Sequence, residues 1–253
     1  MNGYWRHWMR TDMSNRRVIG SLLVWAGLLC ATSAIAAPPK PAAAATVLPL
    51  NTKIEGLGYA ELSARWWRWT DRFPGGMEPY RDPDGRWCAV AQDGPVWFLA
   101  GTDGSANVKR RCSVPVGKHV FLPIINLYQR TRYRIATRQR AAECRSLLDG
   151  LALNNDALRS AVVLIDGVQV TDPKRYRART EGCFDAFGDD ENDGTAAVIA
   201  ASDGYWLLLP PMKPGRHTLV VGANYGRGDA DEDGYGNMVQ NFEYVLDVGG
   251  PTY

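Results

Sequence analysis

An acidic loop near the C-terminus has the residue spacing of a calcium site. Asp229, Asp231 and Asp233 stand at alternate positions, and Gly234 follows them. Alternate carboxylates before a glycine can wrap around one calcium ion, because calcium prefers oxygen ligands and the glycine permits a sharp turn. The carbonyl oxygen of Tyr235 is a further candidate ligand. We therefore predict a weak, structural calcium site here; the alternative is a solvated acidic turn.

A second acidic loop repeats this pattern less completely. Asp189, Glu191 and Asp193 stand at alternate positions and form a weaker candidate calcium site. Neither loop has the bidentate glutamate that helix-loop-helix calcium sites place at the twelfth position, where Gln240 and Ala200 stand instead. Neither loop is flanked by two convincing helices, so an EF-hand is excluded. The same spacing also occurs in calcium loops of β-rich extracellular proteins, and a loop of that kind stays open.

Residues suited to catalysis are scarce. Beyond residue 36 the histidines are His119 and His217, and both lie in strand-like runs, where a histidine is more often a half-buried structural group than a general base. The sequence contains no G-x-S-x-G, H-E-x-x-H or glycine-rich phosphate motif. A pair of carboxylates for glycoside cleavage stays open, because their separation is spatial and does not show in a sequence.

The cysteines predict two disulfide bonds. Four cysteines lie beyond residue 36: Cys88, Cys112, Cys144 and Cys183. An even number of cysteines without a C-x-x-C motif is typical of an oxidising compartment, and four cysteines allow three pairings. We expect Cys88–Cys112 and Cys144–Cys183, because each bond closes a local loop between neighbouring elements. Such bonds leave no thiol nucleophile.

The first 36 residues have the features of a signal peptide. Arg16 and Arg17 precede an apolar run at residues 18–29, and residues 34–36 form an A-x-A cleavage site. A start at Met13 would give a leader of ordinary length. The apolar run is short for a membrane span. We therefore expect a periplasmic or secreted protein with no membrane span after cleavage.

Removal of the leader makes the chain nearly neutral. The whole chain has 29 basic and 27 acidic residues, and the leader takes away four arginines against one aspartate. A neutral chain gives no indication of a nucleic-acid or anionic-membrane partner. Residues 37–55 begin with an alanine- and proline-rich stretch and are expected to form a spacer, whereas residues 56–253 are long enough for one domain.

Residues 59–73 have the period of an amphipathic helix. One continuous apolar stripe consists of Tyr59, Leu62, Trp66, Trp69 and Phe73. Trp67 lies off this stripe, so the helix is expected to bury two faces. Aromatic residues at helical spacing usually belong to a core rather than to a sugar-binding surface.

Short strand patterns dominate the rest of the chain. They fall at residues 87–92, 96–100, 110–114, 120–125, 204–209, 217–223 and 242–248. Residues 161–170 form a hairpin pattern around Asp166-Gly167, and residues 138–153 read as a second helix. We therefore expect a mainly β fold with two helices. Its architecture is predicted to be an antiparallel β-sandwich, immunoglobulin-like by analogy, with the Trp-rich helix packed on it.

Several blocks of this sequence occur together in a known group of proteins. They are residues 58–69 (GYAELSARWWRW), 94–102 (GPVWFLAGT), 111–118 with 121–126, 203–206 (DGYW) and 214–218 (PGRHT). In these blocks the chain resembles a family of secreted bacterial and archaeal proteins, over most of residues 56–250. The resemblance implies export, a Cys88–Cys112 bond and a β-rich fold, and it implies no activity.

The patterns favour a non-enzymatic binding or envelope-associated domain, with an extracytoplasmic ligand such as a glycan. The alternative is a secreted hydrolase that cleaves polysaccharide with two carboxylates. A cleft lined with exposed tryptophan, in which two carboxylates face each other about 5–10 Å apart, would favour the hydrolase.

Thermal melting tests the calcium prediction. Millimolar calcium is expected to raise the melting temperature of the mature protein, because a site at ten times its dissociation constant adds on the order of 1 kcal/mol. The Asp231→Ala variant should lose this shift. No shift in the parent protein, or an equal shift in the variant, would leave the loop as a solvated turn.

Overall fold

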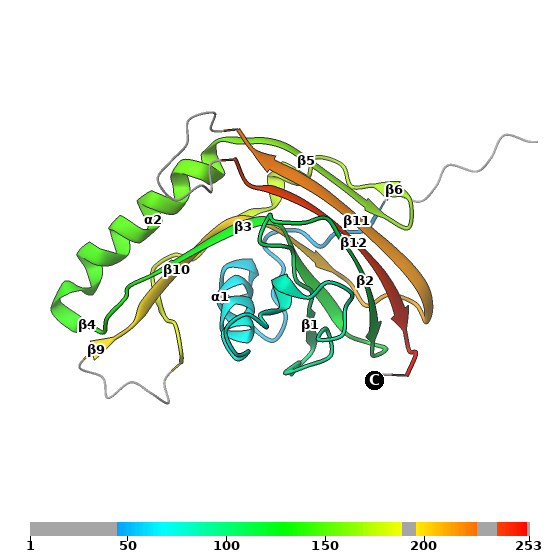
Figure 1. Ribbon diagram of the computed structural model, residues 1–253, viewed down its shortest axis with the longest axis horizontal. Coiled ribbons are helices and arrows are strands. Elements are labelled where there is room, and N and C mark those ends of the chain that lie inside the picture. The colour runs from blue at the N-terminus through cyan, green and yellow to red at the C-terminus, as the bar shows by residue number, and fades with distance from the viewer. Residues whose placement is uncertain (1–44, 189–195, 227–236, 252–253) are drawn as a thin grey trace, which may run out of the picture. The chain divides into compact units, whose positions relative to one another are not determined.

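A computed structural model describes residues 45–188, 196–226 and 237–251 (Figure 1). This part of the chain is mainly β with two α-helices, as the sequence predicts. The helices are α1 (Tyr59–Thr70) and α2 (Arg140–Asp156). Short 3₁₀ turns are η1 (Pro79–Arg81), η2 (Thr137–Gln139) and η3 (Pro173–Tyr176).

Most strands belong to two five-stranded sheets. The first sheet contains β1 (Val96–Phe98), β3 (His119–Arg130), β10 (Ile199–Leu209) and β7 (Arg177–Arg179), with β8 (Phe184–Asp185) also paired to β10. The second contains β2 (Val108–Val114), β12 (Val239–Val248), β11 (Gly215–Tyr225), β5 (Leu158–Ile165) and β6 (Val168–Gln169). A separate ladder joins β4 (Ile135–Ala136) to β9 (Ala196–Ala197).

The strand pairing is mixed, which corrects the expectation of an antiparallel sandwich. β1 runs parallel to β3, and β2 runs parallel to β12. The connectivity explains the parallel pairs, because β1, β2 and β3 alternate between the two sheets and are therefore joined by crossovers rather than hairpins. The analogy with immunoglobulin domains is not confirmed. Residues 87–92, expected as a strand, instead form turns that carry Cys88.

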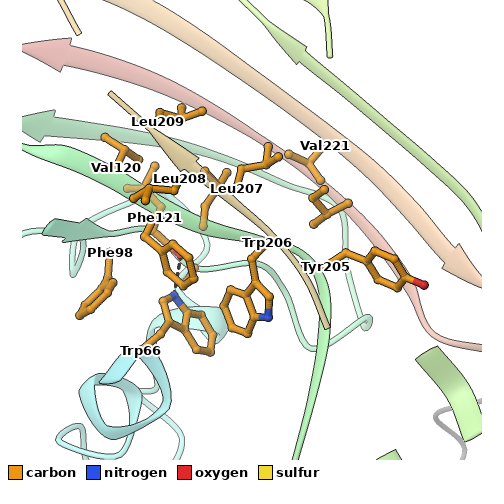
Figure 2. Close-up of a cluster of buried hydrophobic side chains, with 14 of the residues drawn as sticks. Trp66, Phe98, Val120, Phe121, Tyr205, Trp206, Leu207, Leu208, Leu209 and Val221 are labelled. Atoms are coloured by element: carbon orange, nitrogen blue, oxygen red, sulfur yellow. Dashed lines mark hydrogen bonds between the residues drawn. The ribbon is translucent and has the colours of Figure 1, made fainter. Parts of the chain in front are cut away.

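β10 lies at the centre of the layers. All of its residues are buried, because both of its faces are covered. On one face Trp206 packs against Trp66 of α1, with ring centroids 5.5 Å apart. On the other face Leu207 points toward Val221 of the second sheet (Figure 2). Figure 1 shows the same order, with α1 below β3 and β10 and the strands β11 and β12 above them.

α1 forms where the sequence predicts it but ends at Thr70, short of the predicted end at Phe73. The stripe residues within the helix face the first sheet and are buried, whereas Phe73 lies beyond the helix and is half-buried. The indole N–H of Trp66 donates to the carbonyl of Leu99 at 2.8 Å, so this large ring is buried without losing a hydrogen bond. Within the described ranges, no helix combines the length and the apolar character needed to cross a membrane.

The segment before α1 lies on the domain, although the sequence predicts a spacer over residues 37–55. The backbone N–H of Leu48 donates to the carbonyl of Leu208 at 2.8 Å, and the Leu48 carbonyl accepts from the Tyr59 hydroxyl at 2.5 Å. Val47 and Ile54 also pack against the core. From residue 45 on, this segment therefore packs on the folded domain.

Both expected disulfide bonds are present. Cys88–Cys112 and Cys144–Cys183 join Cα atoms that are 5.9 and 5.6 Å apart. The first bond ties the turns after η1 to β2, and the second ties α2 to the segment before β8. Each bond therefore fixes a loop-rich region to a regular element and restricts the unfolded chain.

The predicted Asp166-Gly167 turn joins β5 to β6. Both residues have positive φ, 50° and 76°, as a type I′ turn requires. Asp166 also reaches β11, where its Oδ1 accepts from the Thr218 N–H at 2.8 Å and its Oδ2 lies 2.7 Å from His217 Nδ1. Burial lowers the pKa of His217, but Asp166 and the Lys213 carbonyl together outweigh burial, so the pKa lies above its ordinary 6.5.

Two glycine-to-alanine substitutions, one in β10 and one in β11, test the packing of β10. Gly204→Ala should lower the free energy of unfolding by about 1–3 kcal/mol, because overpacking forces the backbone to shift. A Cβ at Gly204 would lie 2.5 Å from the Cβ of Asn126 in β3. Gly222→Ala in β11 is the matched control, since nothing lies within 4 Å of a Cβ there. Urea unfolding of the oxidised protein compares the two, and equal effects would contradict the close approach.

His217 gives the stability a pH dependence. Because the pKa of His217 is raised in the folded state, its ion pair with Asp166 contributes its full stabilisation of the fold below pH 6.5. This stabilisation is lost as the pH rises through the raised pKa of the folded state. Asp166→Asn keeps the turn and an acceptor for Thr218 but removes the charge. In mild acid the free energy of unfolding of the wild type should exceed that of this variant by up to about 1 kcal/mol. In mild alkali this advantage should vanish, and a difference independent of pH would contradict the ion pair.

Candidate binding pocket

A pocket of about 320 Å³ lies beside α1. Its walls come from α1, from η1, from the segment after β1, from β3 and from the residue before β12. The lining residues are Trp66, Trp67, Tyr80, Arg81, Gly101, Thr102, Asp103, Asn126, Leu127, Tyr128 and Met238. These segments are far apart in the sequence, so the pocket exists only in the folded domain.

Aromatic rings form one wall of this pocket. Trp67 stacks on Tyr128, with ring centroids 4.6 Å apart and planes 18° apart, and Tyr80 lies 6.4 Å from Trp67. Trp67 is half-buried, and its indole N–H donates to the Ser202 hydroxyl at 3.1 Å, which fixes the ring. Burial raises the pKa of Tyr80 to about 12, so its phenol stays neutral. The wall is therefore apolar, with neutral hydroxyl groups.

Asn126 contributes a buried polar group to the lining. It is 6% exposed, and its Nδ2 has no hydrogen-bond partner among the described residues. Gly204 pairs with Asn126 across the sheet and leaves it room, since any larger residue would collide with it. A buried donor without an acceptor costs about 1–3 kcal/mol. Because the Nδ2 is itself buried, a ligand oxygen would relieve this cost only after a small displacement of the neighbouring lining side chains.

Two buried side chains hold the segment after β1. Arg110 of β2 donates to the carbonyls of Ala100 and Gly101 at 2.9 and 2.7 Å. Gln240 of β12 accepts from the Thr102 N–H at 2.7 Å and donates to the Thr102 carbonyl at 2.6 Å. Gly101 is required at this point, because a Cβ would lie 2.8 Å from the Gln240 Oε1. This wall of the pocket is therefore rigid.

Charged residues at the pocket are paired with one another. Arg81 lies 3.3 Å from Glu78 and 3.7 Å from Asp103. Burial raises the pKa of Asp103, but hydrogen bonds from Ser105 and the charge of Arg81 together lower it below its ordinary range. Asp103 is therefore ionised at neutral pH. The pocket offers donors and acceptors without a large excess of either charge.

The predicted calcium loops lie outside the described residues. This applies to the candidate ligands Asp229, Asp231, Asp233, Tyr235, Asp189, Glu191 and Asp193. The side chain of Gln240, at the twelfth position of the first loop, is bound to Thr102 instead. Where the structure describes the chain, no group of three or more His, Cys, Asp or Glu residues could hold a metal ion. Calcium binding therefore stays a prediction.

The two histidines do not meet at this pocket. His217 is engaged with Asp166 in the second sheet, as described above. His119 begins β3, and burial lowers its pKa. Neither is among the residues that line the pocket. The described cysteines form the two disulfide bonds, so none of them lies free beside the pocket.

Two carboxylates do share a hollow elsewhere, beside the first disulfide bond. They are Asp84 and Asp247, and no tryptophan lines that hollow among the described residues. Arg86 binds both carboxylate oxygens of Asp84, at 2.9 and 2.6 Å, and Arg111 binds Asp247 at 2.7 Å. These arginines lower the pKa of both carboxyls, whereas the acid of a glycosidase needs a raised pKa.

The sequence indicates the helix beside the pocket but not the pocket itself. Trp67 stands off the apolar stripe of α1, and that position is the one signal of a second contact face. Asn126 and Tyr128 follow a long apolar run that predicts a buried strand, and nothing local marks them as lining residues. Tyr80 lies in a stretch without a regular period. Only tertiary structure brings these residues together.

The likenesses to solved structures that the comparisons give are weak. No protein-family model and no curated protein matches this chain. The solution structure of Amebosin covers 62% of this chain and 99% of its own, at 9% identity and a TM-score of 0.21. The structure of PbICP-C in complex with falcipain-2 covers 61% of this chain and 99% of its own, at 10% identity and a TM-score of 0.22. At these TM-scores the likeness supports no conclusion about fold or function.

Proposed function

We propose that this protein is an exported binding protein that takes a neutral sugar unit of a glycan into the pocket beside α1. The observation that carries the proposal is the buried, unpartnered amide of Asn126 next to the ring wall of Trp67, Tyr80 and Tyr128. Apolar ring surface combined with a few fixed polar groups is typical of small-molecule sites.

The chemistry of the pocket suits a sugar. The C–H faces of a pyranose ring can pack on Trp67 and Tyr80, and a ring or hydroxyl oxygen can accept from the Asn126 Nδ2. Sugar hydroxyls can donate to the ionised Asp103. The volume of about 320 Å³ lies at the small end of ligand pockets, which favours one or two sugar units over a long chain segment.

Binding accounts for the pocket better than hydrolysis does. Asp103 is the one carboxylate among its described lining residues, and a glycosidase needs two. The pKa of Asp103 is lowered, which makes it a poor proton donor. The two carboxylates of the other hollow are held by arginines. These features favour a binding protein over the alternative of a polysaccharide hydrolase.

Export rests on the leader and on the disulfide bonds. Residues 1–36 have the parts of a signal peptide, and two disulfide bonds are formed in the domain. Disulfides persist in oxidising compartments and are rare in the bacterial cytosol. The resemblance to a family of secreted proteins points the same way. These features support our proposal that the protein acts in the periplasm or outside the cell, where its ligand would be a glycan.

Calorimetric titration of the mature protein with cello-, xylo- and chito-oligosaccharides tests the proposal. At least one of these series should bind. Tyr80→Ala should weaken binding about three- to tenfold, because one aromatic contact is worth about 0.5–1.5 kcal/mol. Tyr133→Ala is the matched control, since Tyr133 is 78% exposed and outside the pocket.

Two results would contradict the proposal. In the first, no series binds at millimolar concentration, or both tyrosine variants bind as the wild type does. In the second, the wild type releases reducing ends from a bound oligosaccharide and Asp103→Asn abolishes the release. That second result would establish the hydrolase instead.

A further inference from the structure

A second hollow, of about 250 Å³, also lies beside α1. It is formed between α1, the segment before it and the residues that lead into β1. It shares no lining residue with the pocket described above. Its chemistry is also different, because its polar groups are mainly arginines.

Three arginines of α1 and the turn after it line this hollow, and one of them is free. Arg72 pairs with Asp93 at 3.1 Å. Arg68 donates to the carbonyl of Asp185 at 2.9 Å and lies over the ring of Phe184. The exposed Arg65 has no hydrogen bond, ion pair or ring contact with any described residue. Its guanidinium is therefore available to a ligand.

The hollow has an excess of positive charge. Asp93 is the one acidic residue among its described lining, against three arginines. Lys118 adds a further positive charge nearby, since its ammonium donates to the carbonyl of Gly94, which also lines the hollow. An arginine presents a planar fork of donors that matches a carboxylate in two parallel hydrogen bonds.

The base of the hollow is apolar. Leu62, Trp69 and Phe98 line it and are 1, 2 and 5% exposed. Pro95 and Val96 extend this surface along the edge of the first sheet. A small hydrocarbon group can pack there, whereas an inorganic anion would leave the apolar surface uncovered. Arginines above an apolar base therefore match a ligand with one anionic end and one apolar end.

We propose that this hollow binds a small organic carboxylate. The carboxylate pairs with Arg65, and the hydrocarbon part packs against Leu62, Trp69 and Phe98. The ligand is of the size of an aromatic or short aliphatic acid, because the hollow measures about 250 Å³. The proposal does not depend on glycan binding, since the two pockets have separate linings.

NMR titration of the ¹⁵N-labelled mature protein with benzoate tests this site, with benzyl alcohol and inorganic phosphate as comparison probes. Benzoate should shift the resonances of residues around Leu62 and Phe98, and it should bind at least tenfold more tightly than either comparison probe. Arg65→Gln should weaken benzoate binding at least tenfold. Arg145→Gln is the matched control, because Arg145 is an exposed arginine on α2 and does not line the hollow.

Benzoate affinity unchanged by Arg65→Gln would overturn the proposal, as would equal binding of benzyl alcohol or of phosphate. Absence of any shift at ten millimolar benzoate would overturn it too. Tyr80→Ala should leave benzoate binding unchanged, so a failure of the glycan pocket can be told apart from a failure of this one. Loss of benzoate binding in Tyr80→Ala would count against a separate site.

Discussion

The buried guanidinium of Arg110 is the interaction on which this structure most depends. Arg110 is 1% exposed and donates five hydrogen bonds, all to neutral oxygens. Its partners are the carbonyls of Tyr80, Asp82, Ala100 and Gly101 and the hydroxyl of Tyr244. A buried charge is strongly destabilising unless such bonds compensate it, so the chain must bring all of these segments to one point. Two walls of the aromatic pocket, at Tyr80 and Gly101, are fixed by this requirement.

The buried anchoring of α1 also fixes the positions of its side chains at the surface. Its buried side is anchored by Trp66, which packs on Trp206 and donates to the Leu99 carbonyl. Because the helix cannot rotate on that anchor, Trp67 is held over one pocket and Arg65 over the other. A single Trp-rich helix therefore serves as a core element and as the wall of two chemically different hollows.

The features that the sequence predicts correctly depend on residues that lie fairly close together in the chain. The stripe of α1, the Asp166-Gly167 turn and both disulfide pairings follow from spacing and residue type over short stretches, and the structure contains them. The parallel pairs and the pocket could not be predicted, because they depend on crossovers between sheets. Asn126 shows the limit most clearly: the space for its Cβ depends on the missing side chain of Gly204, which is distant in sequence.

The central claim is that the Asn126 amide receives a ligand oxygen inside the aromatic pocket. The most direct measurement is the pair of side-chain NH₂ resonances of Asn126, assigned by their loss in Asn126→Ser and followed during saccharide titration. We predict that both resonances shift at saturation and that their exchange with solvent slows, because the amide gains an acceptor and is covered. Unchanged Asn126 resonances, while a saccharide binds elsewhere on the protein, would contradict the account.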